Sequence, residues 1–159
     1  MKTADERRPL IDTIRVFPEM LSETIAGLDA DQLNLVTIPD EWTVQQIVHH
    51  LPDSHMNAVI RLKLILTADR PHLQGYDQAA WALLPDVANT PIEASLSILR
   101  GLHARWVNLW ESLTDDQWQR VGIHSERGPL TPDDLLVLYD DHCKIHLDQI
   151  RKVRAAMPQ

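Results

Sequence analysis

The chain has 159 residues, of which 44% are hydrophobic and 24% are charged, a balance that fits one globular domain over residues 1–159 and excludes a disordered chain. Its 15 basic and 23 acidic residues give a net charge of -8, so we expect no nucleic-acid partner. A single cysteine, Cys143, excludes an intrachain disulfide. The N-terminus lacks a secretion signal and no apolar run is long enough for a membrane span, so we expect a cytoplasmic protein with no membrane partner.

Apolar residues recur at helical spacing in four long windows, and strand signals are nearly absent, which predicts an all-α domain. The first window predicts a helix over roughly residues 8–28. Pro18 lies inside it and lacks a backbone donor, so we expect a kink or a restart there. The segment 68–89, between the second and third windows, is long for a tight helical hairpin and permits a crossover.

The second helix starts near Val44, where Thr43 and Gln46 have the spacing of a capping box. Pro52 interrupts its hydrogen-bond ladder, so we expect a bend beside His50.

Threonine-proline pairs mark the starts of the last two helices. Thr90 is the expected cap of the third, with Pro91 at the first helical position and Glu93 closing a capping box. The fourth begins at Thr131 and runs to about Ala155.

His142 and His146 are four residues apart, so both imidazoles lie on one face of the fourth helix, in register with its apolar positions. Such a pair can hold one metal ion, or its rings can simply be hydrogen bonded or partly exposed. His50 favours the metal, since three imidazoles from two helices would leave open positions for a ligand. His49 and Cys143 point away from this face, so neither is an expected ligand.

Ser54, Asn57 and Arg61 continue a polar stripe from His50 along the second helix. Such a stripe is either a solvated face or the lining of a substrate pocket that runs away from the histidines. No carboxylate stands at a spacing that marks it as a general base, and Cys143 occupies the position where a zincin motif needs its glutamate. The expected role of the tryptophans is packing in the core or at the bundle ends: Trp42, Trp106, Trp110 and Trp118.

Two motifs resemble the DinB/YfiT-like superfamily, and most closely its YfiT branch. They are W-T-V-Q-Q-I-V-H-H-L-P-D-S-H-M-N-A at 42–58 and H-C-K-I-H at 142–146. The similarity continues through Y-D-Q-A-A-W at 76–81, P-I-E-A-S-L at 91–96 and L-H-A-R-W at 102–106.

This resemblance implies a four-helix bundle with up-down-down-up topology that forms a homodimer. It also implies that His50, His142 and His146 bind zinc or nickel. Pro52 departs from the family pattern, in which a helix former is expected at that position.

The same resemblance implies an enzyme. Some family members are S-transferases that use a low-molecular-weight thiol such as bacillithiol, and a metal with three neutral ligands suits a thiol nucleophile without a protein base. We therefore expect a thiol and a small electrophile as the substrates. The alternatives are a metal-dependent hydrolase that activates water and a non-catalytic stress-response protein whose histidines join two helices.

Overall fold

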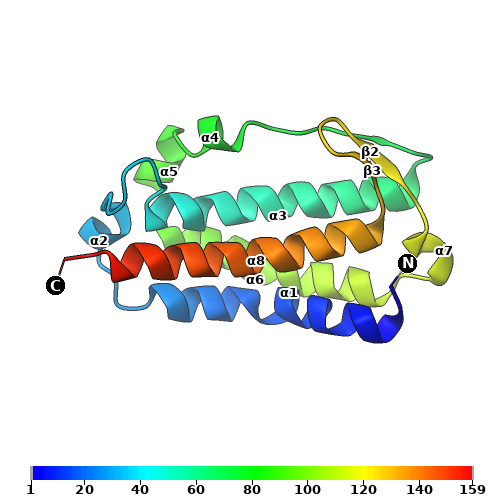
Figure 1. The fold of residues 1–159 in the computed structure, drawn as a ribbon, viewed down its shortest axis with the longest axis horizontal. Helices are drawn as coiled ribbons and strands as arrows, with labels where there is room; N and C mark the ends of the chain where they lie inside the picture. The colour runs from blue at the N-terminus through cyan, green and yellow to red at the C-terminus, as the bar shows by residue number, and fades with distance from the viewer. Residues whose placement is uncertain (1, 159) are drawn as a thin grey trace.

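The computed structural model describes residues 2–158, and four long helices form its frame (Figure 1). These are α1 (Ala4–Ile25), α3 (Val44–Thr67), α6 (Ile92–Glu111) and α8 (Pro132–Ala155). Helices α1 and α8 run in one direction, and α3 and α6 run in the other (Figure 1). Each of α1 and α3 packs against both α6 and α8. The predicted four-helix bundle with up-down-down-up order is confirmed.

Short elements fill the connections. Helix α2 (Ala30–Asn34) follows α1, and the crossover from α3 to α6 contains β1 (His72–Leu73), α4 (Gln78–Trp81) and α5 (Pro85–Asn89). The α6–α8 connection contains α7 (Asp115–Trp118), β2 (Gly122–His124) and β3 (Gly128–Leu130).

The three strands form a small sheet in which β2 pairs with β1 in parallel and with β3 antiparallel. The sequence predicted no strands, because two or three residues are too few to show alternating hydropathy. The sheet joins the two long connections beside one end of α3 (Figure 1).

The expected start signals hold for two of the three later helices. Thr43 with Gln46, and Thr131 with Asp134, form complete capping boxes. The expected Thr90 cap is wrong: α6 begins one residue later, after Pro91, and has no side-chain cap.

The prolines do not end the helices, so of the two outcomes expected at Pro18 the restart does not occur. Helix α1 starts earlier than predicted and passes through Pro18, and α3 continues through Pro52. Because Pro18 has no N–H, the carbonyl of Ile14 lacks its usual helical partner. The His103 Nδ1 atom lies 2.6 Å from that carbonyl oxygen and replaces the missing bond.

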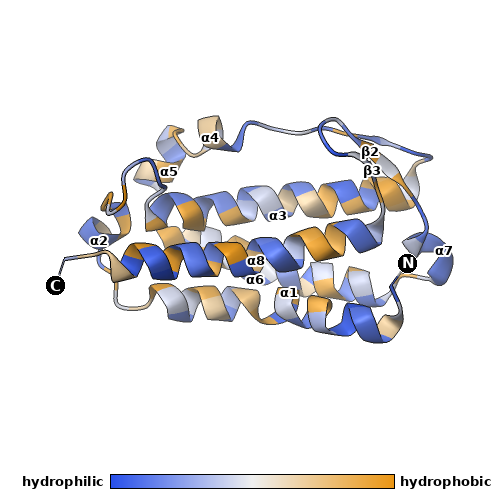
Figure 2. Cartoon of the chain, viewed as in Figure 1, coloured by the Kyte–Doolittle hydropathy of each residue, from blue (hydrophilic) through white to orange (hydrophobic). Residues whose placement is uncertain are grey.

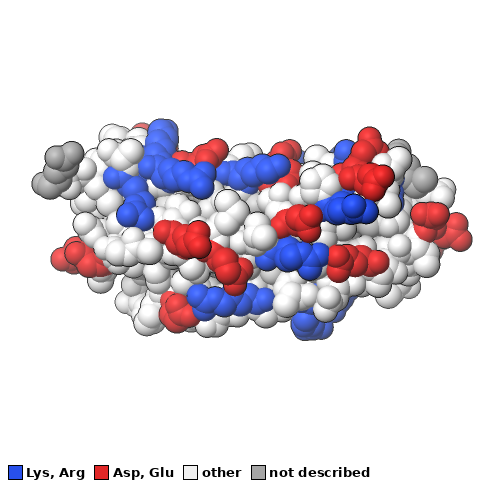
Figure 3. All heavy atoms as spheres, turned by 90° about the horizontal axis from the view of Figure 1, so that it is seen from below, with Lys and Arg blue, Asp and Glu red and all other residues white. Residues whose placement is uncertain are grey.

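Helix faces divide into buried apolar and exposed polar sides, as the alternating patches of Figure 2 show. Trp106, Trp110 and Trp118 are buried in the core, as expected, whereas Trp42 is half-buried and packs against a histidine ring. Acidic and basic side chains alternate on the face shown in Figure 3. Within residues 2–158, no helix is long and apolar enough to cross a membrane.

Candidate metal centre

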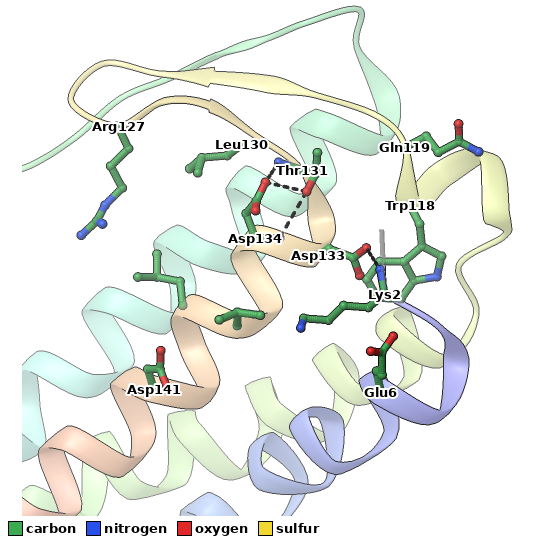
Figure 4. A pocket seen from close by; sticks show the side chains of 12 residues that line it. Lys2, Glu6, Trp118, Gln119, Arg127, Leu130, Thr131, Asp133, Asp134 and Asp141 are labelled. Carbon is green, nitrogen blue, oxygen red and sulfur yellow. Dashed lines mark hydrogen bonds between the residues drawn. The ribbon is translucent and has the colours of Figure 1, made fainter.

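A cavity of about 830 Å³ is lined mainly by residues of α1, α7 and α8, and Asp133 and Asp134 are among its acidic side chains (Figure 4). Asp133 forms a buried ion pair with Arg7 and accepts a hydrogen bond from the backbone N–H of Lys2. Asp134 bonds to Thr131 in the helix cap. These two carboxylates therefore serve in folding.

Three histidines converge between α3 and α8. The Nε2 atom of His142 lies 3.3 Å from Nε2 of His50 and 3.2 Å from Nε2 of His146. Nitrogens that bind one tetrahedral zinc ion at 2.0–2.1 Å are about 3.3 Å apart, so this spacing matches a shared metal. The structure thus brings together all three predicted ligands, and within residues 2–158 no carboxylate or cysteine joins their cluster.

The hydrogen bonds of His142 extend inward through two histidines that the sequence analysis did not single out. His142 Nδ1 lies 3.1 Å from Nε2 of His55, and His55 Nδ1 lies 2.7 Å from Nε2 of His103. His103 Nδ1 reaches the carbonyl oxygen of Ile14. We call His142, His55 and His103 the histidine relay. It connects the metal centre to α6 and to the carbonyl that Pro18 leaves free.

That one carbonyl determines the tautomer of every ring in the relay. Because a carbonyl only accepts, His103 carries its hydrogen on Nδ1, and burial lowers its pKa to about 4, so the ring is neutral at pH 7. Its Nε2 must then accept from His55 Nδ1, and His55 Nε2 must accept from His142 Nδ1. Burial also lowers the pKa of His55 and of His142. His142 therefore presents an Nε2 lone pair to the centre.

His146 is oriented in the same way by a different partner. Its Nδ1 donates to Oε1 of Gln149 at 2.9 Å, which leaves a lone pair on Nε2. Two lone pairs therefore face each other across 3.2 Å with no hydrogen to share. They repel unless a cation lies between them, so the donor set fits a metal ion.

His50 completes the cluster through packing. Its ring centroid lies 4.9 Å from that of Trp42, and the edge contact between the rings holds the imidazole in place. Burial, followed by the nearby charge of His146, lowers the pKa of His50 to about 4. Burial lowers the pKa of His146 as well, so all three candidate ligands favour the neutral form in which imidazole binds a metal.

His49 and Cys143 stand apart from the centre, as predicted. His49 bonds to Ser95 and to the carbonyl of Thr90, which ties α3 to the start of α6. Cys143 is fully buried, and burial raises the pKa of its thiol, so it has little nucleophilic character.

A second cavity, about 360 Å³, opens beside His142 and is the substrate pocket candidate. Ser54 and Arg61 line it, as the pocket reading of the polar stripe predicted. Asn57 does not: among the described residues it is absent from the lining, and its side chain donates to the Asp53 carbonyl one helical turn back. We therefore leave Asn57 out of the candidate substrate site.

Sequence reasoning also missed Tyr139, which lies between the histidines and this cavity. Its hydroxyl donates to the Ser54 carbonyl at 3.1 Å, and burial raises its pKa. The Ser54 hydroxyl lies 3.4 Å from both the Tyr139 hydroxyl and His142 Nε2. The cavity therefore begins at the metal centre with neutral hydroxyl groups.

The DinB superfamily model matches residues 13–150, most of the chain. The chain belongs to the DinB superfamily. Its relatives include two proteins named "Putative metal-dependent hydrolase". One, from Geobacillus thermodenitrificans, is 40% identical and aligns over 95% of this chain and 85% of its own. The other, from Oceanobacillus iheyensis, is 41% identical over 88% and 81%.

A solved structure gives the same family and fold. It is described as "YfiT from Bacillus subtilis is a probable metal-dependent hydrolase with an unusual four-helix bundle topology". It is 34% identical to this DinB-superfamily chain, covers 96% of it and 88% of its own length, and superposes with a TM-score of 0.92. The resemblance seen in the sequence is therefore confirmed.

Proposed function

We propose that this protein is a divalent-metal-dependent transferase that joins a low-molecular-weight thiol of the bacillithiol kind to a small electrophile. The observation that supports this most is the neutral ligand set. Three uncharged imidazoles converge beside a cavity that Ser54 and Tyr139 line, and within residues 2–158 no carboxylate joins the histidine cluster. The relatives' names support dependence on a metal.

His50, His142 and His146 would hold the ion, with zinc or nickel as the proposed metal. When bound, the metal would act as a Lewis acid that lowers the pKa of a thiol at its open side. Because the ligands are neutral, they leave the ion its full positive charge, which a thiol tolerates better as a thiolate.

The chain's own residues would position the reactants. Ser54 and Tyr139 offer hydroxyl groups at the inner end of the cavity, and the walls bring the thiol and the electrophile together. The new carbon–sulfur bond forms as the leaving group departs with its electron pair, and the thiol proton passes to solvent. No protein base is required.

The direct test is a conjugation assay on protein purified without added metal, stripped with a chelator and reloaded with zinc or nickel. We expect the loaded protein to accelerate conjugation, with a rate that reaches its plateau well below the free thiol pKa of about 8.5. His142→Ala should abolish this effect. The matched control is Cys143→Ala, a neighbouring buried position outside the cluster, which should retain it.

The names of the relatives favour one alternative, a metal-dependent hydrolase. The same assay separates the two functions. Efficient hydrolysis of esters or amides by loaded protein without any thiol, together with no conjugation, would replace the transferase by the hydrolase.

A further inference from the structure

Arg61 is a buried cation without an anion. Its side chain lies on α3 at 8% exposure and lines the cavity beside the metal centre. Its Nη2 atom donates to the Gln74 carbonyl at 2.7 Å, and its Nε atom is buried with no hydrogen-bond partner. Within residues 2–158 it forms no ion pair. The guanidinium lies 5.8 Å from the centroid of the Tyr76 ring, a contact that offsets only part of the cost of burying the charge, so an anionic partner from outside the chain is expected.

Arg7 shows what such a partner looks like in this fold. It is buried to a similar extent, at 6% exposure, and binds one carboxylate through the same edge of its guanidinium. The Nε atom lies 2.7 Å from one oxygen of Asp133, and Nη2 lies 3.1 Å from the other. In Arg61 the Nη2 atom of this edge already donates to the Gln74 carbonyl, but the Nε hydrogen is unused, and the residue lines the cavity.

His124 supplies a second donor to the same cavity. Its Nδ1 accepts from the backbone N–H of Glu126 at 3.2 Å, so the ring hydrogen is on Nε2. Within residues 2–158 that nitrogen has no hydrogen-bond partner. The lining also contains two exposed carboxylates, Asp77 and Glu126. Asp77 is occupied in capping α4, and Glu126 lies beside Gly75.

We propose that Arg61, with His124, binds a carboxylate carried by one of the two substrates while the reacting atom lies at the metal centre. This deepens the proposed function and rests on it for the identity of the reacting groups. Arg61 is seven residues from Ser54, a rise of about 10 Å along the helix, so the carboxylate lies several bonds from the reacting atom. The thiol or the electrophile can supply it.

The first test is equilibrium binding, which needs no catalysis. Chelated protein is titrated calorimetrically with glutarate, a dicarboxylate, and with glutaramide, its neutral analogue. We expect glutarate to bind more tightly, and R61Q to weaken glutarate binding about tenfold or more, as for a lost charged hydrogen bond. R61K retains the charge but loses the planar fork, so its affinity should be intermediate. It serves in place of R61Q if that variant does not fold.

The matched control is R127Q, an exposed arginine in the lining of the same cavity, which should change glutarate affinity less than about twofold, as expected for a solvated charge. Equal binding of glutarate and glutaramide, no binding of either, or unchanged glutarate binding in both Arg61 variants overturns the proposal.

The second test assigns the carboxylate to a substrate. Two comparisons of the conjugation rate are made with metal-loaded protein. In the first, iodoacetamide is the electrophile, and the thiol is either 3-mercaptopropionate or 2-mercaptoethanol. In the second, 2-mercaptoethanol is the thiol, and the electrophile is either iodoacetate or iodoacetamide. The comparison in which R61Q removes the preference for the carboxylate-bearing reagent identifies the substrate that carries the carboxylate. If the unmodified protein shows no such preference in either comparison, the substrate assignment is contradicted. Arg61-dependent glutarate binding without any conjugation would leave the anion site standing and refute the transferase.

Discussion

Replacing His103 tests whether the histidine relay sets up the metal centre. Phenylalanine fills the site but removes both hydrogen bonds of the ring. The Nδ1–H group of His55 and the carbonyl of Ile14 would then be unpaired in the core, and each such group costs about 1–3 kcal/mol. His103→Phe should therefore lower the free energy of unfolding by about 2–6 kcal/mol. His103→Gln keeps one donor and one acceptor on a planar amide, so its loss should stay near 1 kcal/mol.

The assay has two readouts on each variant. Urea unfolding of chelated protein, followed by circular dichroism, gives the free energy of unfolding, and competition with a chelator gives the metal affinity. Loss of an outer-shell partner typically weakens metal binding 10–100-fold. We expect a loss in that range for His103→Phe and a smaller one for His103→Gln. Equal losses in both variants, or unchanged metal affinity in His103→Phe, would refute the relay.

Three more outcomes follow from the same structure. In His146→Ala, the metal content should fall. A chelator should lower the melting temperature of the unmodified protein but not that of His146→Ala, because the ion joins α3 to α8. A drop of the same size in both proteins would exclude this role. Chelated protein should lose stability as the pH falls from 6.5 to 4, by about 3 kcal/mol from His103 alone. The reason is that His103 binds a proton in the unfolded chain in this pH range, whereas its lowered pKa keeps it largely neutral in the folded chain. Urea midpoints independent of pH would contradict this prediction. A homodimer is expected, because Met56, Ile60 and Leu64 expose an apolar stripe along α3; light scattering that gives one chain mass at micromolar protein would exclude it.

The helices and the ligand triad could be predicted from the sequence because their signals are local. Capping boxes at Thr43 and Thr131 mark two helix starts, and the four-residue spacing of His142 and His146 puts both rings on one face. His50 could be added because it lies next to the core position Leu51, on a helix that can face the fourth helix. The topology itself came from the family resemblance.

The relay could not be predicted, because it joins residues that are distant in the sequence. His103 occupies a core position of α6 between Leu99 and Trp106, which was a usable signal, but nothing local pairs it with His55 or with the carbonyl of Ile14. Pro18 appeared as a helix breaker, whereas in the bundle its missing donor leaves an acceptor for His103. Similarly, only the fold shows that Arg7 forms a buried ion pair, whereas Arg61 forms none within residues 2–158 and its Nε atom has no hydrogen-bond partner.

The most direct test of the central claim is X-ray absorption spectroscopy of zinc-loaded protein before and after addition of a thiol. Before addition, the data should show three imidazole nitrogens at about 2.0–2.1 Å. After addition, one sulfur at about 2.3 Å should join them, and His142→Ala should lose both features. A zinc shell with four protein ligands, or one that takes up no sulfur at saturating thiol, would contradict the account.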